Sequence, residues 1–438
     1  MYNTLSRLLP MAPQVAFFWR KLGKPFASML EQASFPLNIQ CRCLIFVYAR
    51  VLGMMGPHDG SGNPSFMTYD GSPVELSWII PKADPTRKHK VDRQIRFAIE
   101  PIDPRTGGLL PGALVLDYLA SPVGSLGIVD CQDDAMAWRR TLENFLFPGT
   151  VGSQIRDGSK FFVGFDFTSA GIIKLKAYYI PAPKPTLGIR NSNARQESVH
   201  LWDPDWTRLR NLVMQLHPSL IKPLDKLISF IDGLDDLYKP RIEIFSVDCV
   251  GSNVNRLKIY CRPREGASWS DACRVMTLGG RISSPAMIDA LAHLEVLWNN
   301  LFPSSRSTSN RQLELPLDSR SGARLSKRNA QHPTRGLLYY FSLHPGTDIP
   351  LPKIYLPVSR YCRNDLQICR AVEQVYKVDE KRNNTTPACP EGWVAREVAN
   401  TFNHRNLTTR TGIHTYITLA YKGKGWEMTN YFSPEVWS

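Results

Sequence analysis

Stretches with an apolar residue at every third or fourth position recur along this 438-residue chain and predict helices. Val394, Val398 and Phe402, for example, lie four residues apart and would share one helix face. Ser284-Pro285 supplies an N-cap and a proline at the first position of another helix. We expect helices over residues 14–32, 36–52, 133–147, 205–216, 223–234, 284–301, 365–376 and 391–404.

Between these helices lie shorter apolar runs that are rich in β-branched and aromatic residues, which predict strands. We expect ten strands, over residues 74–80, 94–102, 160–167, 172–181, 241–247, 256–262, 336–343, 352–357, 414–421 and 426–431. Most come as consecutive pairs joined by short turns, such as Ser169-Ala170-Gly171, and such pairs must be antiparallel. This order predicts an α+β fold. Ten antiparallel strands with helices outside could close into one barrel, which removes exposed sheet edges; two separate α+β domains are the competing arrangement.

Charge and cysteine content narrow the class of protein. The chain has 53 Lys and Arg against 39 Asp and Glu, so its net charge of +14 indicates an anionic partner. Its nine cysteines include no C-x-x-C pair, which argues against a structural zinc site and is typical of reduced thiols in an intracellular protein. The apolar run 43–55 is interrupted by Arg50 and is too short to span a bilayer, so we expect no transmembrane helix.

One short pattern, Lys-x-Tyr, recurs in three of the predicted strands. The three copies are Lys176-Ala-Tyr178, Lys258-Ile-Tyr260 and Lys353-Ile-Tyr355. Residues i and i+2 of a strand face the same side, so each copy places an ammonium and a phenol on one face. Arg256 adds a guanidinium to that face in the second copy, and Arg96 lies in another strand that is otherwise fit for burial.

A single Lys-x-Tyr is most simply a solvated strand face, but three copies in apolar strands favour an inward orientation. Five cations would then converge inside the fold: Arg96, Lys176, Arg256, Lys258 and Lys353. Burying them is costly without an anion, and a diphosphate would supply one, with about 4 kcal/mol for each charge pair before desolvation. Aromatic faces attract cations and exclude water, so a shield of tyrosines could protect the carbocation left by a departing diphosphate. The candidates are Tyr178, Tyr260, Tyr355 and Tyr416.

Together with these units, several longer segments resemble the fungal aromatic prenyltransferases of the dimethylallyltryptophan synthase type. The segments are DGSPVELSW (70–78), IRFAIEPI (95–102), PKIYLPV (352–358) and the closing TYITLAY and MTNYFSPE. The resemblance runs along most of the chain and implies a single ten-stranded antiparallel barrel surrounded by helices, built from αββα repeats, with the active site inside. We therefore expect one domain over residues 1–438, with the Ser-, Arg- and Asn-rich segment 303–335 as a flexible surface loop.

The resemblance also implies roles for single residues. Glu75 matches the carboxylate that accepts a hydrogen bond from the indole N–H of the acceptor. The five cations match the diphosphate-binding positions, although some members carry Gln in place of Lys353. The four tyrosines match the tyrosine shield. The implied partners are dimethylallyl diphosphate and an aromatic small-molecule acceptor, with no metal and no cofactor.

One position departs from the family pattern. Tryptophan-type members carry a lysine, taken as a general base, on the strand before the first Lys-x-Tyr strand, whereas the aligned residue within Lys160-Phe161-Phe162-Val163-Gly164 is apolar. This argues against free tryptophan and for a larger or more hydrophobic indole, such as an indole diterpene or a cyclic dipeptide. A phenolic acceptor, such as tyrosine or a xanthone, is the alternative.

We therefore expect a cytoplasmic, monomeric or homodimeric enzyme that prenylates an aromatic ring by metal-independent electrophilic substitution. A metal-dependent synthase is disfavoured because the aspartates at 232, 235 and 236 and at 133 and 134 lack the D-D-x-x-D order. A non-enzymatic nucleic-acid-binding protein would explain the charge of +14, but it would carry its basic residues in surface stripes with aromatics. The position of the Lys-x-Tyr units in apolar strands favours a buried anion site instead.

Overall fold

The computed structural model describes residues 1–62, 64–65, 67–81, 94–130, 134–147, 161–181, 205–236, 238–263, 266–302, 336–382 and 390–437. The segment 303–335, predicted as a flexible loop, lies outside the described residues, as does Lys160.

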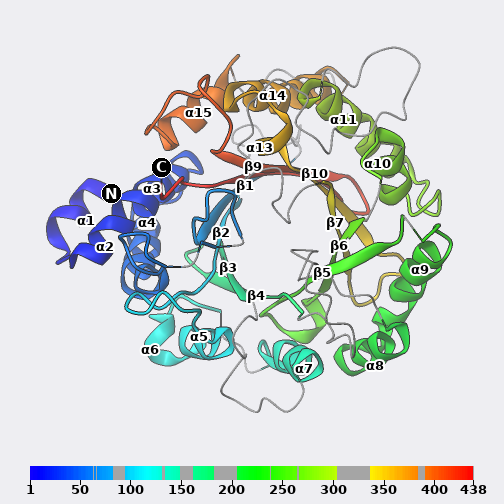
Figure 1. The fold of residues 1–438 in the computed structure, drawn as a ribbon, viewed down its shortest axis with the longest axis horizontal. Helices are drawn as coiled ribbons and strands as arrows, with labels where there is room; N and C mark the ends of the chain where they lie inside the picture. The colour runs from blue at the N-terminus through cyan, green and yellow to red at the C-terminus, as the bar shows by residue number, and fades with distance from the viewer. Residues whose placement is uncertain are drawn as a thin grey trace, which may run out of the picture.

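Ten antiparallel strands close into a single barrel, viewed close to its axis in Figure 1. The strands are β1 (Val74–Pro81), β2 (Gln94–Ile99), β3 (Phe161–Phe167), β4 (Ile173–Tyr179), β5 (Pro240–Asp248), β6 (Leu257–Pro263), β7 (Leu338–Leu343), β8 (Leu351–Leu356), β9 (His414–Tyr421) and β10 (Trp426–Phe432). Each strand pairs with its neighbours in sequence, and β10 closes the ring against β1, with Leu76 opposite Phe432. The predicted fold class is therefore confirmed, and one closed sheet takes up all ten strands instead of two separate sheets.

Alternation along the strands separates an apolar outer face from an interior that holds charged side chains together with a smaller aromatic and apolar cluster. In β2, Ile95, Phe97 and Ile99 are buried beneath the helices, while Arg96 points into the barrel. The ring of Phe97 lies 5.5 Å from that of Phe26 in the helical layer. The main core therefore lies between sheet and helices, and the barrel interior is left for other chemistry.

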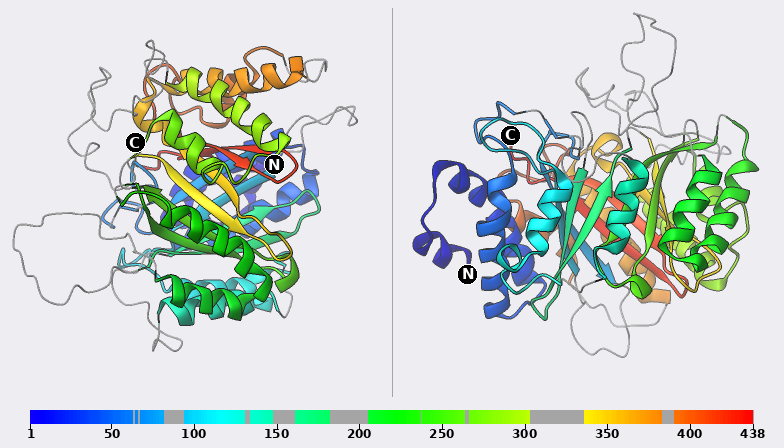
Figure 2. Two further views of the ribbon diagram at one scale, coloured as in Figure 1. Left: turned by 90° about the vertical axis from the view of Figure 1, so that its right-hand side faces the viewer. Right: turned by 90° about the horizontal axis from the view of Figure 1, so that it is seen from below.

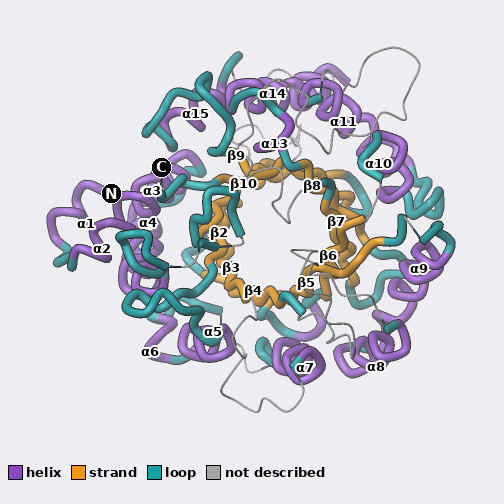
Figure 3. Tube along the Cα trace, in the orientation of Figure 1, coloured by secondary structure: helices purple, strands orange, loops and turns teal. Residues whose placement is uncertain are grey.

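Helices cover the barrel on the outside (Figures 2 and 3). The α-helices are α1 (Tyr2–Leu8), α2 (Pro13–Phe18), α3 (Lys24–Gln32), α4 (Leu37–Phe46), α5 (Gly112–Ala120), α6 (Pro122–Ser125), α7 (Ala137–Leu146), α8 (Trp206–Leu216), α9 (Ile221–Asp232), α10 (Trp269–Met276), α11 (Pro285–Leu301), α13 (Val358–Tyr361), α14 (Asp365–Arg382) and α15 (Trp393–Thr401). Two π-helical turns, η1 (Trp19–Gly23) and η2 (Val47–Val51), lie within the first two helices predicted from the sequence. The helices missed by the sequence pattern are α1, α5, α6, α10 and α13, all of nine residues or fewer.

The apolar run 43–55 belongs to a longer helical stretch. Leu37–Met54 is long and apolar enough, by length and composition alone, to cross a membrane, so the helical stretch is longer than the apolar run 43–55 indicated. In this fold, however, the stretch packs on the barrel: Cys43, Phe46 and Val47 are buried, and the ring of Phe46 lies 6.0 Å from that of Phe165 on β3. A core helix of a soluble protein passes the same test of composition.

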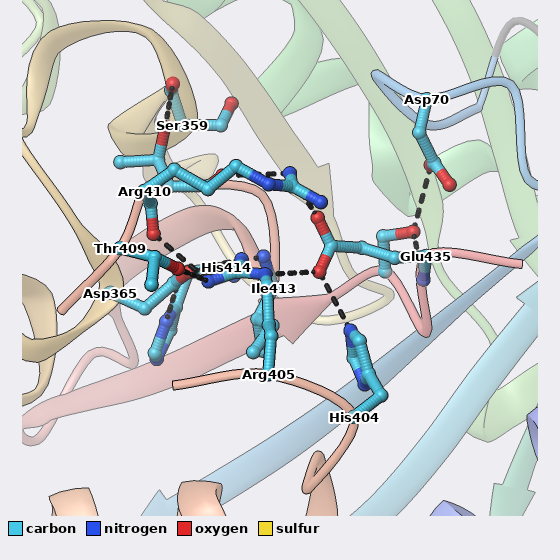
Figure 4. A network of polar contacts seen from close by, with 12 residues as sticks. Asp70, Ser359, Asp365, His404, Arg405, Thr409, Arg410, Ile413, His414 and Glu435 are labelled. Carbon is cyan, nitrogen blue, oxygen red and sulfur yellow. Dashed lines mark hydrogen bonds and ion pairs between the residues drawn. The ribbon is translucent and has the colours of Figure 1, made fainter. Parts of the chain in front are cut away.

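A buried network of charges joins the end of the chain to the start of β9 (Figure 4). Asp365 accepts hydrogen bonds from Arg405 Nη2 at 2.6 Å and from the backbone N–H of His414 at 2.8 Å. Glu435 binds Arg405 Nε at 2.6 Å and His404 Nε2 at 2.7 Å. Because Arg405 bridges the two carboxylates, the network holds α14, β9 and the segment after β10 together.

This network predicts a large loss of stability in Asp365→Ala. Removing one partner leaves buried charge uncompensated, so we expect the free energy of unfolding to fall by about 3–5 kcal/mol in urea titrations. Asp225→Ala is the matched control, because its partner Arg210, 2.9 Å away, is exposed and such pairs contribute about 0–1 kcal/mol. Equal losses in the two variants would contradict the assigned role of the network.

Candidate active site

All ten residues singled out in the sequence line one cavity inside the barrel. The cavity encloses about 1000 Å³ of space, counting its open mouth. The three Lys-x-Tyr units point inward, so the alternative of solvated strand faces is wrong.

Strand direction sorts the lining residues along the barrel axis. Arg96 lies near the start of β2, and Lys258 lies near the start of β6. Glu75 and Tyr416 lie near the starts of β1 and β9, which run in the opposite direction. The cations therefore gather at one end of the cavity, which we call the cation end, and Glu75 lies towards the other, which we call the acceptor end.

At the cation end, the buried carboxylate of Asp166 on β3 holds two of the five cations. Arg96 Nε lies 2.9 Å from Asp166 Oδ1, and Lys176 Nζ lies 2.6 Å from Oδ2. Burial opposes ionisation of Asp166, but Arg96 and Lys176 outweigh it and hold the pKa of this carboxyl below its ordinary value. For Lys176, burial and the nearby Arg96 lower the pKa to about 8.

A second carboxylate, Asp248 at the end of β5, holds two more cations and approaches Lys176. Arg256 Nε lies 2.7 Å from Asp248 Oδ2, and Lys258 Nζ lies 2.6 Å from Oδ1. Lys176 Nζ is 4.0 Å from the same carboxylate. Burial again opposes ionisation, yet Arg256 and Lys258 hold the pKa of Asp248 well below its ordinary value. The charges thus alternate from β2 to β6.

Lys353 is placed differently from the other four cations. Its Nζ donates hydrogen bonds to Thr429 Oγ1 and Tyr431 OH, both at 3.1 Å. It also lies 5.1–5.6 Å from the ring centres of Tyr340, Tyr355 and Tyr431. Burial in this aromatic surrounding lowers the pKa of Lys353 well below its ordinary value.

Six tyrosines line the middle of the cavity, the four predicted ones and also Tyr340 and Tyr431. The rings of Tyr260 and Tyr340 lie 5.2 Å apart, and those of Tyr355 and Tyr431 lie 5.5 Å apart. Both missed tyrosines lack a lysine two residues earlier, so the Lys-x-Tyr pattern could not find them. Their signal was the cross-strand register, which places Tyr340 opposite both Tyr260 and Lys353.

At the acceptor end, Glu75 accepts a hydrogen bond of 2.6 Å from the hydroxyl of Thr415. Burial raises the pKa of Glu75 to about 8, against smaller opposing effects of Thr415 and Lys353. A β-bulge explains why Thr415 and Tyr416, adjacent in sequence, both face the site. Between the pairs Asn430–Ile417 and Phe432–His414, these two residues of β9 oppose the single residue Tyr431 of β10.

A second bulge brings another pair of charges into the acceptor end. Glu243 is the extra residue of β5, between the register pairs Ile242–Cys261 and Ile244–Tyr260. Its carboxylate lies 2.8 Å from the Nε of Arg262, and both side chains are buried and line the cavity. A strict alternation from Ile244 would turn Glu243 outward, so the bulge is what brings its carboxylate in, whereas Arg262 continues the inward set of Lys258 and Tyr260 on β6.

The departure predicted on β3 stays a prediction. Within the described residues 161–167 the inward positions of this strand are Phe162, Gly164 and Asp166, none of them a lysine, while Lys160, two residues before Phe162, lies outside the described residues. A Cβ atom at Gly164 would lie 2.9 Å from Cε2 of Tyr178, so the glycine leaves room for that ring. Among the described residues, no cluster of three His, Cys, Asp or Glu side chains could hold a metal ion.

Comparison with known proteins places this arrangement among aromatic prenyltransferases. A family model described as tryptophan dimethylallyltransferase matches residues 14–385. The 7-dimethylallyltryptophan synthase of Aspergillus fumigatus is 26% identical, covering 100% of this chain and 89% of that protein. The 4-O-dimethylallyl-L-tyrosine synthase of Claviceps purpurea is 29% identical, covering 95% and 87%. The crystal structure of the NotF prenyltransferase shares the fold with a TM-score of 0.70 at 20% identity, covering 98% of each chain.

The raised pKa of Glu75 predicts a pH-dependent loss of stability. Between pH 4.5 and about 8 the folded protein retains a proton on Glu75 that the unfolded chain releases, so the free energy of unfolding falls as the pH rises. Glu75→Gln cannot take up or release this proton. We therefore expect the free energy of unfolding of the variant to rise, relative to that of the native protein, by about 2 kcal/mol between pH 5 and pH 8.5; the value is smaller than the full pKa shift implies because the side chain is partly exposed to water. Urea titrations at both pH values measure it. A stability difference that does not change with pH would contradict the raised pKa.

Proposed function

Because this chain belongs to the tryptophan dimethylallyltransferase family, and so is an aromatic prenyltransferase, we propose that it transfers a dimethylallyl group from dimethylallyl diphosphate to an indole ring without a metal ion. The observation that carries this proposal is the order of groups in the cavity. Cations occupy one end, six tyrosines occupy the middle, and Glu75 lies at the acceptor end.

The cation end suits the diphosphate of the donor. Four cations are held within 3 Å of a carboxylate, and the fifth, Lys353, lies against tyrosine rings. Hydrogen-bond donors that are held in place in a site with little water stabilise the negative charge that develops on a leaving group. When the C–O bond of the donor breaks, its electron pair leaves with the diphosphate, and these cations stabilise the product anion.

The tyrosines suit the allylic cation that remains. The rings of Tyr340, Tyr355 and Tyr431 already surround one cation, the ammonium of Lys353. Aromatic faces attract a carbocation and supply no nucleophilic water. The cation therefore lasts long enough for attack by an electron-rich ring held beside it, which forms the new C–C bond.

Glu75 suits the acceptor. An indole N–H that donates a hydrogen bond to this carboxylate orients the ring towards the tyrosines and favours the ionised form of Glu75. After attack, the ring carbon must lose a proton to a base, and Glu75, directly or through a water molecule, is the candidate.

The residues of β3 guide the choice of acceptor. Phe162 and Gly164 stand where a basic group would face the acceptor, which favours a larger or more hydrophobic indole, such as a cyclic dipeptide or an indole diterpene, over free tryptophan. A phenol is the second candidate, because its O–H can also donate a hydrogen bond to Glu75. One relative, the 4-O-dimethylallyl-L-tyrosine synthase, carries the name of a phenolic product. We further infer a cytoplasmic enzyme, monomeric or homodimeric.

The first test is a prenylation assay in excess EDTA. Purified protein is incubated with dimethylallyl diphosphate and a panel of indoles and phenols, and mass spectrometry detects products heavier by one C5H8 unit. We expect an indole product despite EDTA. A product that forms only when magnesium is supplied would contradict the metal-independent mechanism, and a product from phenols alone would select the second candidate.

The pKa of Lys176 predicts how the use of donor depends on pH. Since Lys176 loses its charge above about pH 8, we expect kcat/KM for the donor to fall as the pH rises from 8 to 9.5. Lys176→Arg keeps a permanent charge and should abolish this fall, although its rate at pH 7 is lower because the fork of arginine differs from an ammonium. If the variant retains the same fall, another group controls it.

A further inference from the structure

We propose that Asp166 and Asp248 are positioning residues, which orient the guanidinium groups of Arg96 and Arg256 so that phosphate oxygens meet donors that are already in place. The inference rests on the proposed function, because it takes the anion of this site to be the diphosphate of the donor. Neither the resemblance to the family nor the sequence pattern assigns a role to these two carboxylates.

The first observation is which nitrogen each carboxylate binds. Asp166 contacts Arg96 through Nε, and Asp248 contacts Arg256 through Nε. The contact with Arg256 is a hydrogen bond of 2.7 Å, which fixes the plane of the guanidinium group and leaves its two terminal nitrogens for another partner. The contact with Arg96 is an ion pair at 2.9 Å, and Arg96 Nη2 donates a hydrogen bond of 2.5 Å to Gln94 Oε1, so Nη1 is the terminal nitrogen left for a ligand. Within the part of the chain that the structure describes, the side chain of Arg256 makes no other hydrogen bond, so its terminal nitrogens are available to a ligand.

The second observation is the position of the carboxylates. Asp166 lies directly opposite Arg96 in the ladder between β2 and β3, and Asp248 lies directly opposite Lys176 in that between β4 and β5. Both aspartates are 9% exposed or less. Their backbone is therefore fixed by the ladder beside the cations, and burial keeps water from competing for their oxygens.

The third observation is that Lys176 lies near both carboxylates. This ammonium lies 2.6 Å from Asp166 and 4.0 Å from Asp248, so it links the two arginine–carboxylate pairs into one chain of alternating charge. A displacement of one carboxylate would therefore disturb both arginines. Bidentate recognition of phosphate by arginine depends on such fixed geometry.

A simpler explanation is that the two aspartates only reduce repulsion between the cations. The two explanations predict opposite results. If charge alone mattered, removing a carboxylate would make the site more positive and would tighten the binding of an anion when binding is measured at about pH 6, well below the pKa of Lys176 that the carboxylates support. If the carboxylates position the arginine forks, removing one would weaken anion binding in spite of the added positive charge.

The experiment compares Asp166→Ala, Asp166→Asn, Asp248→Ala and Asp248→Asn with the native protein. Isothermal titration measures the binding of inorganic diphosphate, and steady-state kinetics measure kcat and KM for donor and acceptor. We expect the alanine variants to bind inorganic diphosphate about 10-fold more weakly and to lose about 100-fold in kcat/KM for the donor, the size of effect that a small misplacement produces. The asparagine variants keep an oxygen that can accept the Nε–H, so they should retain most of the affinity, and KM for the acceptor should be unchanged throughout.

Asp225→Ala is the matched control, because Asp225 makes the same Nε contact with Arg210, at 2.9 Å, on the exposed surface. It should match the native protein in every measurement. If the alanine variants do not fold, Asp166→Ser alone and combined with Arg96→Lys provides the test, since serine is too short to hold the guanidinium group and lysine has no fork to orient. Positioning predicts that Asp166→Ser weakens binding in the native background but has little further effect once Arg96 is lysine.

Unchanged or tighter binding of inorganic diphosphate by the alanine variants would overturn the inference, as would strictly additive losses in the double mutant. Failure of the proposed function would look different. A protein that binds inorganic diphosphate in an aspartate-dependent manner and yet prenylates no aromatic ring would retain this inference and contradict only the proposed reaction.

Discussion

The enclosure of five cations within a closed barrel is the constraint on which the rest of the site depends. Like charges can be buried only with compensating groups, and this chain supplies two carboxylates, the hydroxyls of Thr429 and Tyr431, and the faces of tyrosine rings. A third carboxylate, Glu427, also acts on Arg96, Lys353 and Arg256 and lies 3.5 Å from Lys422. Three carboxylates thus face six cations, so a surplus of positive charge remains, and a diphosphate fits it.

Each strand of the barrel has one face in the apolar core and the other face in the cavity. Outward residues form one apolar core with the helices, which carries the stability of the fold. Because the inward residues are not needed in this core, they can be polar and can point in fixed directions into the cavity. The charged network of Asp365 and Glu435 lies outside the cavity, but it secures the start of β9, from which Thr415 and Tyr416 reach Glu75 and the tyrosines.

Two β-bulges change which side chains line the acceptor end of the cavity, where the aromatic acceptor is proposed to bind. On β9 the bulge lets two consecutive residues face the cavity, and on β5 it brings in the buried pair of Glu243 and Arg262. Both bulges lie at the acceptor end, while the ladder at the cation end is regular around Asp166 and Asp248. The regular part of the barrel thus holds the general donor site, and the irregular part shapes the site for the acceptor.

The sequence by itself determined the ten strands and the inward cations and tyrosines of the Lys-x-Tyr units, because hydrophobic alternation and this local spacing depend only on neighbours in the chain. The single barrel and the place of Glu75 in its cavity were implied by the resemblance of longer segments to aromatic prenyltransferases. The sequence could not identify Asp166, Asp248, Tyr340 or Tyr431, whose partners lie on other strands and are set by register. Nor could it place Glu243 and Thr415, because a bulge breaks the two-residue period from which inward positions are inferred. Tertiary structure decided these contacts, since only closure of the barrel brings distant strands within hydrogen-bond distance and removes the water that would otherwise solvate their charges.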